Sequence, residues 1–339
     1  MKRFLRGLLL VSAVLYPLAV VGLWVALARV GESWWPTTVL LYVPRFVWAV
    51  PVPFLALALA IWGPRWLLAL QLAAALIVVL PLMGLELHGR PAPSGTPRLR
   101  VLSYNVNYGF MSHALLRRQI RDAHADVIAL QAFHPRLAPM VAEALADYQV
   151  RTDGEFVIAS RFPIVTSKTG SGEEPGFMQA TLDTPLGLIE LFCTHPRSPR
   201  TGLEALRGRG LRQGLSNGRV LRGEGADRVL ANTELRRRQV DELSAAARAA
   251  THPVIIAGDT NLPSLSRFLD EYLGGWQDGF SQVGRGFGYT FPAHRWVPWM
   301  RIDRILASAE LRFLSFEVGT LRASDHHAVW AELEGRPTR

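Results

Sequence analysis

The sequence predicts an α/β, or mixed α+β, globular domain preceded by a transmembrane helical region. Three observations divide the 339 residues in this way. Nearly all of residues 1–87 are apolar, and residues 88–97 are rich in proline, glycine and serine, which is typical of a linker. Residues 98–335 have the mixed composition of a domain with its own core, and β-rich runs alternate there with helical patterns.

The elements of this last part can be placed approximately. The expected strands include residues 99–106, 126–131, 156–159, 187–194, 254–258 and 302–307, and the expected helices include 112–123 and 232–250. One α/β domain can run to about 250 residues, so the part from 98 to 335 needs no further division.

Three apolar runs lie in the first part, at residues 4–28, 46–62 and 66–85. About 20 apolar residues in a helix cross a hydrocarbon layer of roughly 30 Å. A cleaved signal peptide is disfavoured because the first run is too long and two more follow it. We therefore expect three spans. Two spans are the alternative, because the second run has an irregular start that contains Pro44, Arg45, Pro51 and Pro53.

The charges that flank these runs predict an orientation. Lys2, Arg3 and Arg6 precede the first run and favour a cytoplasmic N-terminus. Three spans would then place the globular domain outside the cytoplasm, in a multi-pass protein of a bacterial-type cell (inner) membrane. Two spans would reverse this orientation. The charge difference is reduced by basic residues on the opposite side, namely Arg29, Arg90, Arg98 and Arg100.

The net charge of +9 favours acidic partners, which include phosphates, anionic lipids and nucleic acid. Residues 197–238 contain 11 arginines, whose guanidinium groups suit phosphate binding, although a solvated loop explains this segment equally well. Cys193 is the single cysteine, so the chain has no internal disulfide and no cysteine-based zinc cluster.

Polar residues stand where the expected strands end. Each alone is an ordinary turn residue. Together, carboxylates, amides and imidazoles can bind a divalent cation, neutralise phosphate oxygens and activate water. Oxygen-rich ligands without cysteine suit Mg²⁺ or Mn²⁺ better than zinc. Asn105 and Asp325 are the first metal-binding candidates, and the other polar residues of this kind are His195, Asp259, Asn261, Asp303 and His326.

The order of these residues resembles the endonuclease/exonuclease/phosphatase superfamily, also called the DNase I-like family. The resemblance covers approximately residues 98–335. It implies a two-sheet sandwich flanked by helices, with a metal-dependent phosphoric ester hydrolase site in the loops at one edge. The matching motifs are Asn105, Thr194-His195, Gly258-Asp259-Thr260-Asn261, Ile302-Asp303 and Ser324-Asp325-His326, with further matches at Ser160-Arg161 and Thr290.

The resemblance also implies a role for each residue. His326 would be the general base, and Asp303 would accept a hydrogen bond from its other ring nitrogen. Asp259 and Asn261 would orient water and phosphate, and His195 would donate to a phosphoryl oxygen.

One position departs from the family pattern. The family has a metal-binding glutamate after Leu-Gln, whereas this chain has Ala132 after Gln131. Gln131 cannot replace the glutamate because adjacent strand residues point to opposite faces, so Glu155 or Asn107 would have to approach from other loops. Loss of an outer-shell metal partner costs about 10–100-fold, so we expect the chain to be impaired. An introduced substitution is favoured over natural loss, and both explanations stay open.

The substrate is predicted from the segment just before Asp303. Trp296 and Trp299 lie in RWVPWM, and a site beside a bilayer would let them contact lipid or substrate. Together with the spans, they favour a lipid-linked phosphate, and the chain resembles the membrane enzymes of the teicoplanin-resistance type and the neutral sphingomyelinases. The alternatives are a membrane-tethered nuclease and a non-catalytic protein that binds a phosphate ligand. The sequence defines neither the head group nor the oligomeric state.

Overall fold

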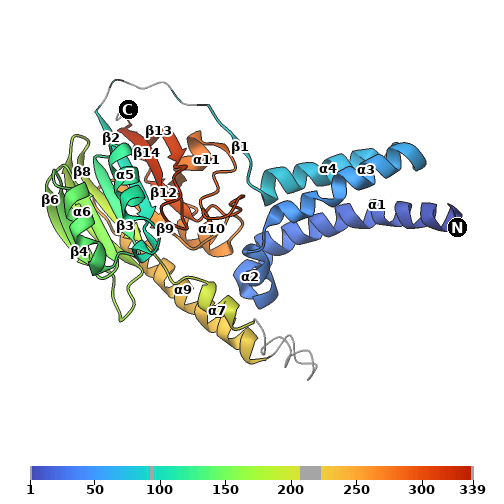
Figure 1. Ribbon diagram of the computed structural model, residues 1–339, viewed down its shortest axis with the longest axis horizontal. Coiled ribbons are helices and arrows are strands. Elements are labelled where there is room, and N and C mark those ends of the chain that lie inside the picture. The colour runs from blue at the N-terminus through green and yellow to red at the C-terminus, as the bar shows by residue number, and fades with distance from the viewer. Residues whose placement is uncertain (1, 90, 92–94, 96, 207–222, 337–339) are drawn as a thin grey trace.

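The computed structural model describes residues 2–89, 91, 95, 97–206 and 223–336, and consists of an apolar helical bundle beside a β-sandwich (Figure 1). The centre of the arginine-rich segment, residues 207–222, lies outside the described residues. So does part of the expected linker, at residues 90, 92–94 and 96.

The helical region is built from apolar helices with short irregular turns between them. Two stretches, Arg3–Ser33 and Arg45–Trp62, are long and apolar enough to cross a membrane, and Leu67–Leu82 is apolar but shorter. Its elements are α1 (Lys2–Val25), a π turn (Ala26–Val30), a 3-10 turn (Gly31–Ser33), α2 (Trp35–Leu41), a 3-10 turn (Arg45–Ala49), α3 (Pro51–Trp62), α4 (Leu67–Ile77) and a π turn (Val78–Leu82).

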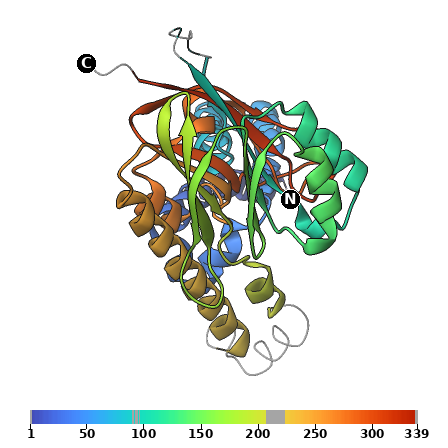
Figure 2. The same cartoon turned by 90° about the vertical axis from the view of Figure 1, so that its left-hand side faces the viewer.

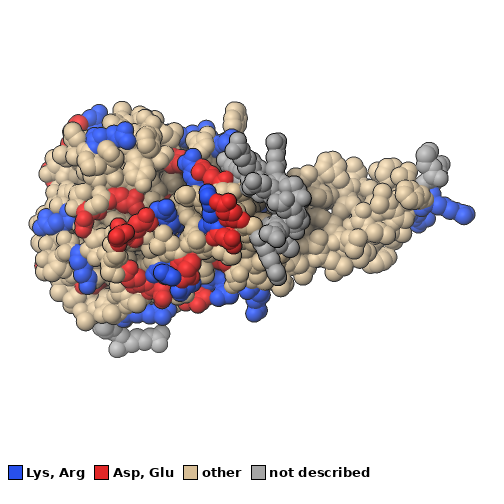
Figure 3. Space-filling model, turned by 90° about the horizontal axis from the view of Figure 1, so that it is seen from below, with Lys and Arg blue, Asp and Glu red and all other residues tan. Residues whose placement is uncertain are grey.

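The helices of this region pack along one another. Leu59 of α3 and Leu67 of α4 are buried against Ala13 of α1, and the Gln71 side chain donates to the Ala13 carbonyl at 2.7 Å. Figure 3 shows that the bundle surface is almost free of charged side chains except at its end away from the sandwich. The sandwich surface, in contrast, carries both signs of charge.

The remaining elements form the sandwich and its cover. The strands are β1 (Glu86–Leu87), β2 (Arg98–Asn105), β3 (Val127–Gln131), β4 (Gln149–Asp153), β5 (Phe156–Ser160), β6 (Ile164–Thr169), β7 (Phe177–Thr184), β8 (Gly187–Thr194), β9 (Val254–Asp259), β10 (Gln277–Asp278), β11 (Arg285–Gly286), β12 (Asp303–Ala307), β13 (Leu311–Val318) and β14 (Val329–Gly335). The helices are α5 (His113–Asp122), α6 (Ala138–Ala144), α7 (Arg200–Glu204), α9 (Glu224–Arg248), α10 (Arg267–Leu273) and α11 (Gly279–Val283), with 3-10 turns at Asn107–Gly109 and Pro135–Leu137.

In the described part of the chain, the main strands form two six-stranded sheets, ordered β10-β12-β9-β8-β7-β6 and β13-β14-β2-β3-β5-β4. The inner faces of the sheets meet in an apolar core that includes Val101, Ile158, Leu191 and Ile305. Figure 2 shows α9 on one side of the sheets and α5 and α6 on the other. The prediction of a two-sheet α/β sandwich preceded by apolar helices is confirmed.

The sheet topology brings the motif residues to one edge. The pairs β2–β3 and β8–β9 are parallel, so Asn105 lies beside Gln131 in one sheet, and the C-terminal ends of β8 and β9 meet in the other. β12 runs antiparallel to β9 and pairs Asp303 with Asp259. Gly258 is required at this edge because a Cβ atom there would lie 2.0 Å from the Thr194 carbonyl oxygen.

Candidate active site

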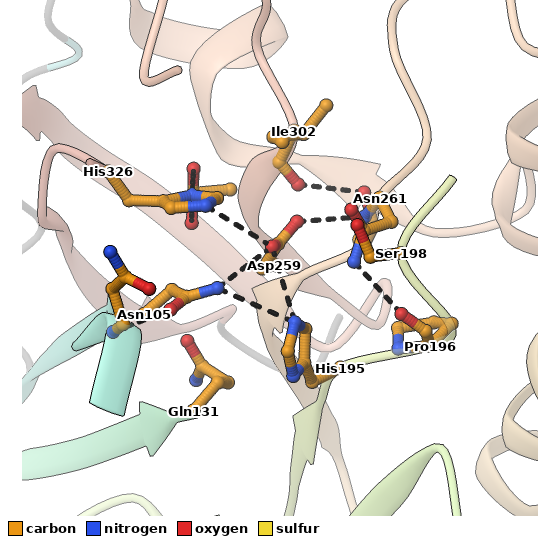
Figure 4. A network of polar contacts seen from close by, with 12 residues as sticks. Asn105, Gln131, His195, Pro196, Ser198, Asp259, Asn261, Ile302 and His326 are labelled. Atoms are coloured by element: carbon orange, nitrogen blue, oxygen red, sulfur yellow. Dashed lines mark hydrogen bonds and ion pairs between the residues drawn. The ribbon is translucent and has the colours of Figure 1, made fainter. Parts of the chain in front are cut away.

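Asp259 is the centre of the polar cluster at this edge (Figure 4). Its Oδ2 atom accepts a hydrogen bond from Asn105 Nδ2 at 3.0 Å and lies 3.5 Å from His195 Nε2 and 3.6 Å from His326 Nε2. Burial and the neighbouring Asp303 raise the pKa of Asp259, although both histidines oppose this shift. Residues from β2, β9 and the segments after β8 and before β14 therefore converge on one carboxylate.

His326 and Asp303 form a buried pair. The ring Nδ1 of His326 lies 2.9 Å from Asp303 Oδ2, which leaves Nε2 directed toward Asp259 (Figure 4). Burial disfavours the charged ring, but the carboxylates of Asp303 and Asp259 outweigh it and raise the pKa of His326 to about 10. The Asp303 backbone N–H donates to Thr290 Oγ1 at 3.3 Å, which explains the threonine of the family pattern.

His195 has a second carboxylate partner that sequence reasoning did not assign. Glu155 Oε1 lies 3.1 Å from His195 Nδ1, and Glu155 Oε2 accepts from the Tyr108 hydroxyl at 3.2 Å. Burial disfavours the ionised carboxyl, but His195 outweighs it and lowers the pKa of Glu155, while Glu155 raises the pKa of the buried His195. Glu155 stands in the β4–β5 turn and has no motif around it, so position alone could not identify it.

Asn261 occupies a tight turn after β9. Its backbone has φ +50, a conformation that asparagine tolerates better than most residues, and its N–H donates to Asp259 Oδ1 at 2.9 Å. Its side-chain amide donates to the Pro196 carbonyl at 2.9 Å. The turn therefore connects the Asp259 carboxylate to the segment that follows His195.

The cluster lines a cleft of about 550 Å³. The lining also includes apolar and aromatic side chains, namely Tyr42 of the helical region with Leu203, Phe291, Trp299 and Met300. Asp325, Arg200, His294 and Arg295 also border the cleft. The cleft lining therefore combines polar, charged and apolar side chains.

Ala132 faces this cleft with a methyl group. Ala132 is buried directly after β3, and its backbone has φ +52. Its side chain has no oxygen atom, so position 132 offers no ligand to a metal in the cleft. Gln131 points instead between the sheets, where its Nε2 contacts Ser103 and Cys193. Of the two substitutes considered from sequence, Asn107 borders the cleft, whereas Glu155 lines a neighbouring pocket and is engaged by His195.

The donor set can be tested against a divalent cation. Among the described residues, ligand atoms of Asp259, Asp303 and His326 all lie within 4.8 Å of one another. Two buried carboxylates side by side repel each other, and a cation would relieve this repulsion. The residues therefore fit a cation such as Mg²⁺ or Mn²⁺. Asn105 and Asp325, the candidates from sequence, border the same cleft, and Asn105 Nδ2 lies 3.0 Å from Asp259 Oδ2.

Other predicted residues lie elsewhere. Trp296 is 95% exposed and does not line the cleft, whereas Trp299 does. Ser160 and Arg161 lie away from the cleft, with Arg161 bonded to Tyr148 and Ala125. His327 is buried and donates its backbone N–H to the Thr290 carbonyl.

Known structures share this fold. An endonuclease/exonuclease/phosphatase from Bacteroides vulgatus is 17% identical, with TM-score 0.54, over 71% of this chain and 100% of that one. The 3'-5' exonuclease NExo from Neisseria meningitidis is 17% identical, with TM-score 0.51, over 70% and 100%. D. rerio TDP2, complexed with single strand DNA product, is 19% identical, with TM-score 0.51, over 70% and 99%.

Curated protein sequences gave no match. A model of the Endonuclease/Exonuclease/phosphatase family, however, matches residues 102–326. This range is the larger part of the chain and contains every motif from Asn105 to His326. The chain therefore belongs to the Endonuclease/Exonuclease/phosphatase family.

Proposed function

We propose that the chain is a membrane-anchored, metal-dependent phosphoesterase that acts on a lipid-linked phosphate ester, phosphodiester or pyrophosphate. The observation that carries this proposal is the mixed lining of the cleft. Asp259 and its partners supply polar groups, while Tyr42 and Met300, which also line the cleft, belong to the same apolar cluster as Leu27 in the helical region. An amphiphile with a terminal phosphate matches such a cleft better than a nucleic acid strand, which is charged along its whole length.

Anchoring is supported by the composition of the helical region. The helices expose many apolar side chains, including Phe54, Leu57 and Trp62 of α3, which water solvates poorly. We propose that residues 1–87 cross a bacterial-type cell membrane three times, that 88–97 form the linker, and that 98–335 form the catalytic domain outside the cytoplasm.

Mg²⁺ or Mn²⁺ is the proposed cofactor. Asp259 would hold it, with Asn105 and Asp325 as further ligands at the same cleft, which leaves His326 and Asp303 for proton transfer. When bound, such a cation neutralises phosphoryl oxygens and makes a bound water more acidic.

The polar residues that line the cleft have proposed roles in hydrolysis. With the charge of Asp259 neutralised, the raised pKa of His326 would fall toward the range in which the ring accepts a proton from water. Asp303 would keep the proton of this ring on Nδ1. His195, held by Glu155, would donate to a phosphoryl oxygen, and Asp259 and Asn261 would orient water and phosphate.

Ala132 is proposed to impair this site. A glutamate at this position would add a carboxylate to the cleft near Asn105, whereas alanine adds none. We therefore propose that this chain has the phosphoesterase activity of the family, but at a lower rate because one metal ligand is missing at position 132. A non-catalytic protein that binds phosphate ligands is the alternative that this position favours.

A membrane-tethered nuclease is the second candidate function. One observation favours it: Tyr108 borders the cleft, and its ring lies 6.0 Å from that of the exposed Phe110. Such an aromatic pair beside a phosphoesterase site could stack with unpaired bases.

A phosphate-release screen tests these functions. The chain and its Ala132→Glu form would be assayed with Mg²⁺ on isoprenoid pyrophosphates, phospholipids, and single-stranded and duplex DNA. Preferred release from a lipid supports the proposal. Preferred cleavage of DNA supports the nuclease, and binding without release by either form supports the non-catalytic alternative.

A further inference from the structure

The junction between the helical region and the sandwich contains buried polar side chains. Glu32, Tyr42 and Arg45 are 2%, 8% and 7% exposed, although the region around them is apolar. Burial of such groups is unfavourable unless each finds a hydrogen-bond partner. The hydrogen-bond partners of these three side chains therefore show which segment of the sandwich the helical region stabilises.

All three side chains bond to the short segment 261–267 of the sandwich. The Tyr42 hydroxyl donates to the Asn261 carbonyl at 3.0 Å, and Arg45 donates to the Ser264 carbonyl at 2.6 Å. Glu32 accepts from the Arg267 backbone N–H at 2.9 Å and from the Ser266 hydroxyl. This segment begins two residues after Asp259, the central residue of the candidate site. The helical region therefore contacts the sandwich next to that site.

Tyr42 is the member of this set that reaches the site itself. It borders the cleft, and its hydroxyl holds the Asn261 turn, whose N–H in turn donates to Asp259 Oδ1. Its own position is fixed from the sandwich side. The Trp299 indole donates to the Tyr42 carbonyl at 3.2 Å, and the buried Arg236 guanidinium lies 5.8 Å from the Tyr42 ring centre.

We propose that Tyr42 is a positioning residue of the active site, and that the helical region is thereby a working part of the site in addition to an anchor. Without its hydroxyl, the Asn261 carbonyl would lose its donor among the described residues, and the turn between Asp259 and Asn261 would open more often. The positional role stands on geometry alone, whereas its effect on turnover rests on the proposed function.

Tyr42→Phe in the full chain tests this role, and Tyr289→Phe is the matched control. The Tyr289 hydroxyl donates to the Met83 carbonyl at 2.9 Å, so it is the same kind of bond across the same junction, but Tyr289 does not line the cleft. Backbone hydrogen exchange would be measured on both variants in lipid nanodiscs, on peptides that cover residues 256–265. We expect about tenfold faster exchange there in Tyr42→Phe and no change in Tyr289→Phe.

Turnover would be measured in the Ala132→Glu background on a short soluble phosphate ester, so that membrane contact plays no part. We expect Tyr42→Phe to lower kcat about tenfold with KM within about twofold, because the bond positions reacting groups without binding substrate. Tyr289→Phe should leave both constants unchanged.

The outcomes separate the two proposals. Unchanged exchange in Tyr42→Phe, or equal increases in both variants, would overturn the positioning role whatever the activity. Faster exchange at the turn with an unchanged kcat would also overturn it, since the turn would then not matter for the reaction. If the Ala132→Glu chain shows no turnover on any substrate, the proposed function fails, while the exchange measurement still decides whether Tyr42 holds the turn.

Discussion

At the scale of single residues, Ala132 leads to the most direct prediction. Ala132→Glu should raise Mg²⁺-dependent phosphate release by at least about 10–100-fold, the range set by losses of weaker outer-shell partners. The new side chain would enter the cleft beside Asn105, and metal affinity should rise with activity. Initial rates and Mn²⁺ binding at matched cation concentrations check this expectation.

Gln131→Glu is the matched control for this change. It adds the same carboxylate one residue away, but position 131 points between the sheets toward Ser103 and Cys193. It should therefore restore no activity. His326→Ala in the Ala132→Glu background should abolish the gain. Rapid turnover by the unrepaired chain, with no gain in Ala132→Glu, would show that another residue supplies the ligand.

Sequence reasoning could find the residues that stand in motifs at strand ends. The order of Asn105, His195 and Asp259 in the family motifs already predicts that they share one site. The pairing of Glu155 with His195 and the contact of Tyr42 with Asn261 could not be predicted, for a physical reason. Glu155 reaches His195 from a turn, and Tyr42 reaches Asn261 from 219 residues away, so tertiary packing alone brings them to the site.

At the scale of elements, Asp278 joins two parts of the sandwich. It caps the start of α11 by accepting from the Phe280 and Ser281 backbone N–H groups, and it forms ion pairs with Arg301 and Arg304 of the β12 region. Removing one partner of a buried ion pair costs about 3–5 kcal/mol. We expect Asp278→Asn to lower the free energy of unfolding by about 3 kcal/mol, the lower end of this range, because the Asp278 side chain is 18% exposed.

Thermal unfolding in nanodiscs checks this expectation, with Glu234→Gln as control. Glu234 also pairs with two arginines, Arg237 and Arg238, but on the exposed surface of α9, where such pairs contribute little. Similar losses in both variants would contradict a special role for Asp278.

The contribution of Asp278 to stability should also depend on pH, with a defined sign. Burial alone would raise the pKa of Asp278, but Arg301 and Arg304 lower it, so its stabilisation is present above the unfolded pKa of about 3.9 and is lost as pH falls below it.

The predicted elements match the structure best where strands are buried on both faces. Residues 187–194 form β8 with the expected bounds, and residues 254–258 form all but the last residue of β9. The edge strands β4 and β6, whose side chains are mostly exposed and polar, were not among the expected strands, and neither were the more buried β7, β13 and β14. α9 begins at Glu224, earlier than the expected 232, because its first turns are stabilised by packing against α7, which local sequence does not reveal.

At the scale of the whole molecule, the helices predict a topology. α1 runs from the N-terminus at the far end to the sandwich, and the turn between α3 and α4 lies toward that far end (Figure 1). Leu9 of α1 packs against the cluster of Leu59 and Leu67, which supports this arrangement. If the bundle crosses the bilayer, the N-terminus and the sandwich lie on opposite sides.

Cysteine labelling in spheroplasts tests this orientation. Cys193 is fully buried, so a membrane-impermeant maleimide should report only cysteines introduced at the surface. We expect Asp183→Cys in the sandwich to be labelled in intact spheroplasts, and Arg3→Cys only after lysis, since both positions are exposed. The reverse pattern would place the sandwich in the cytoplasm.

The last prediction concerns the loop between Phe291 and Met300, where the two tryptophans differ. Trp296 is 95% exposed, and Val297 beside it is also exposed, whereas Trp299 lines the cleft and donates to the Tyr42 carbonyl. Moving an apolar side chain from water into lipid gains about 1.5–3 kcal/mol, which corresponds to about tenfold or more in partitioning. In the Ala132→Glu background, Trp296→Ser should therefore lower activity on a lipid phosphate in proteoliposomes about tenfold and activity on a short soluble ester less than about twofold. Trp299→Ser should lower both, because it removes part of the cleft wall. Equal losses on both substrates in Trp296→Ser would remove the case for insertion of this loop into the bilayer.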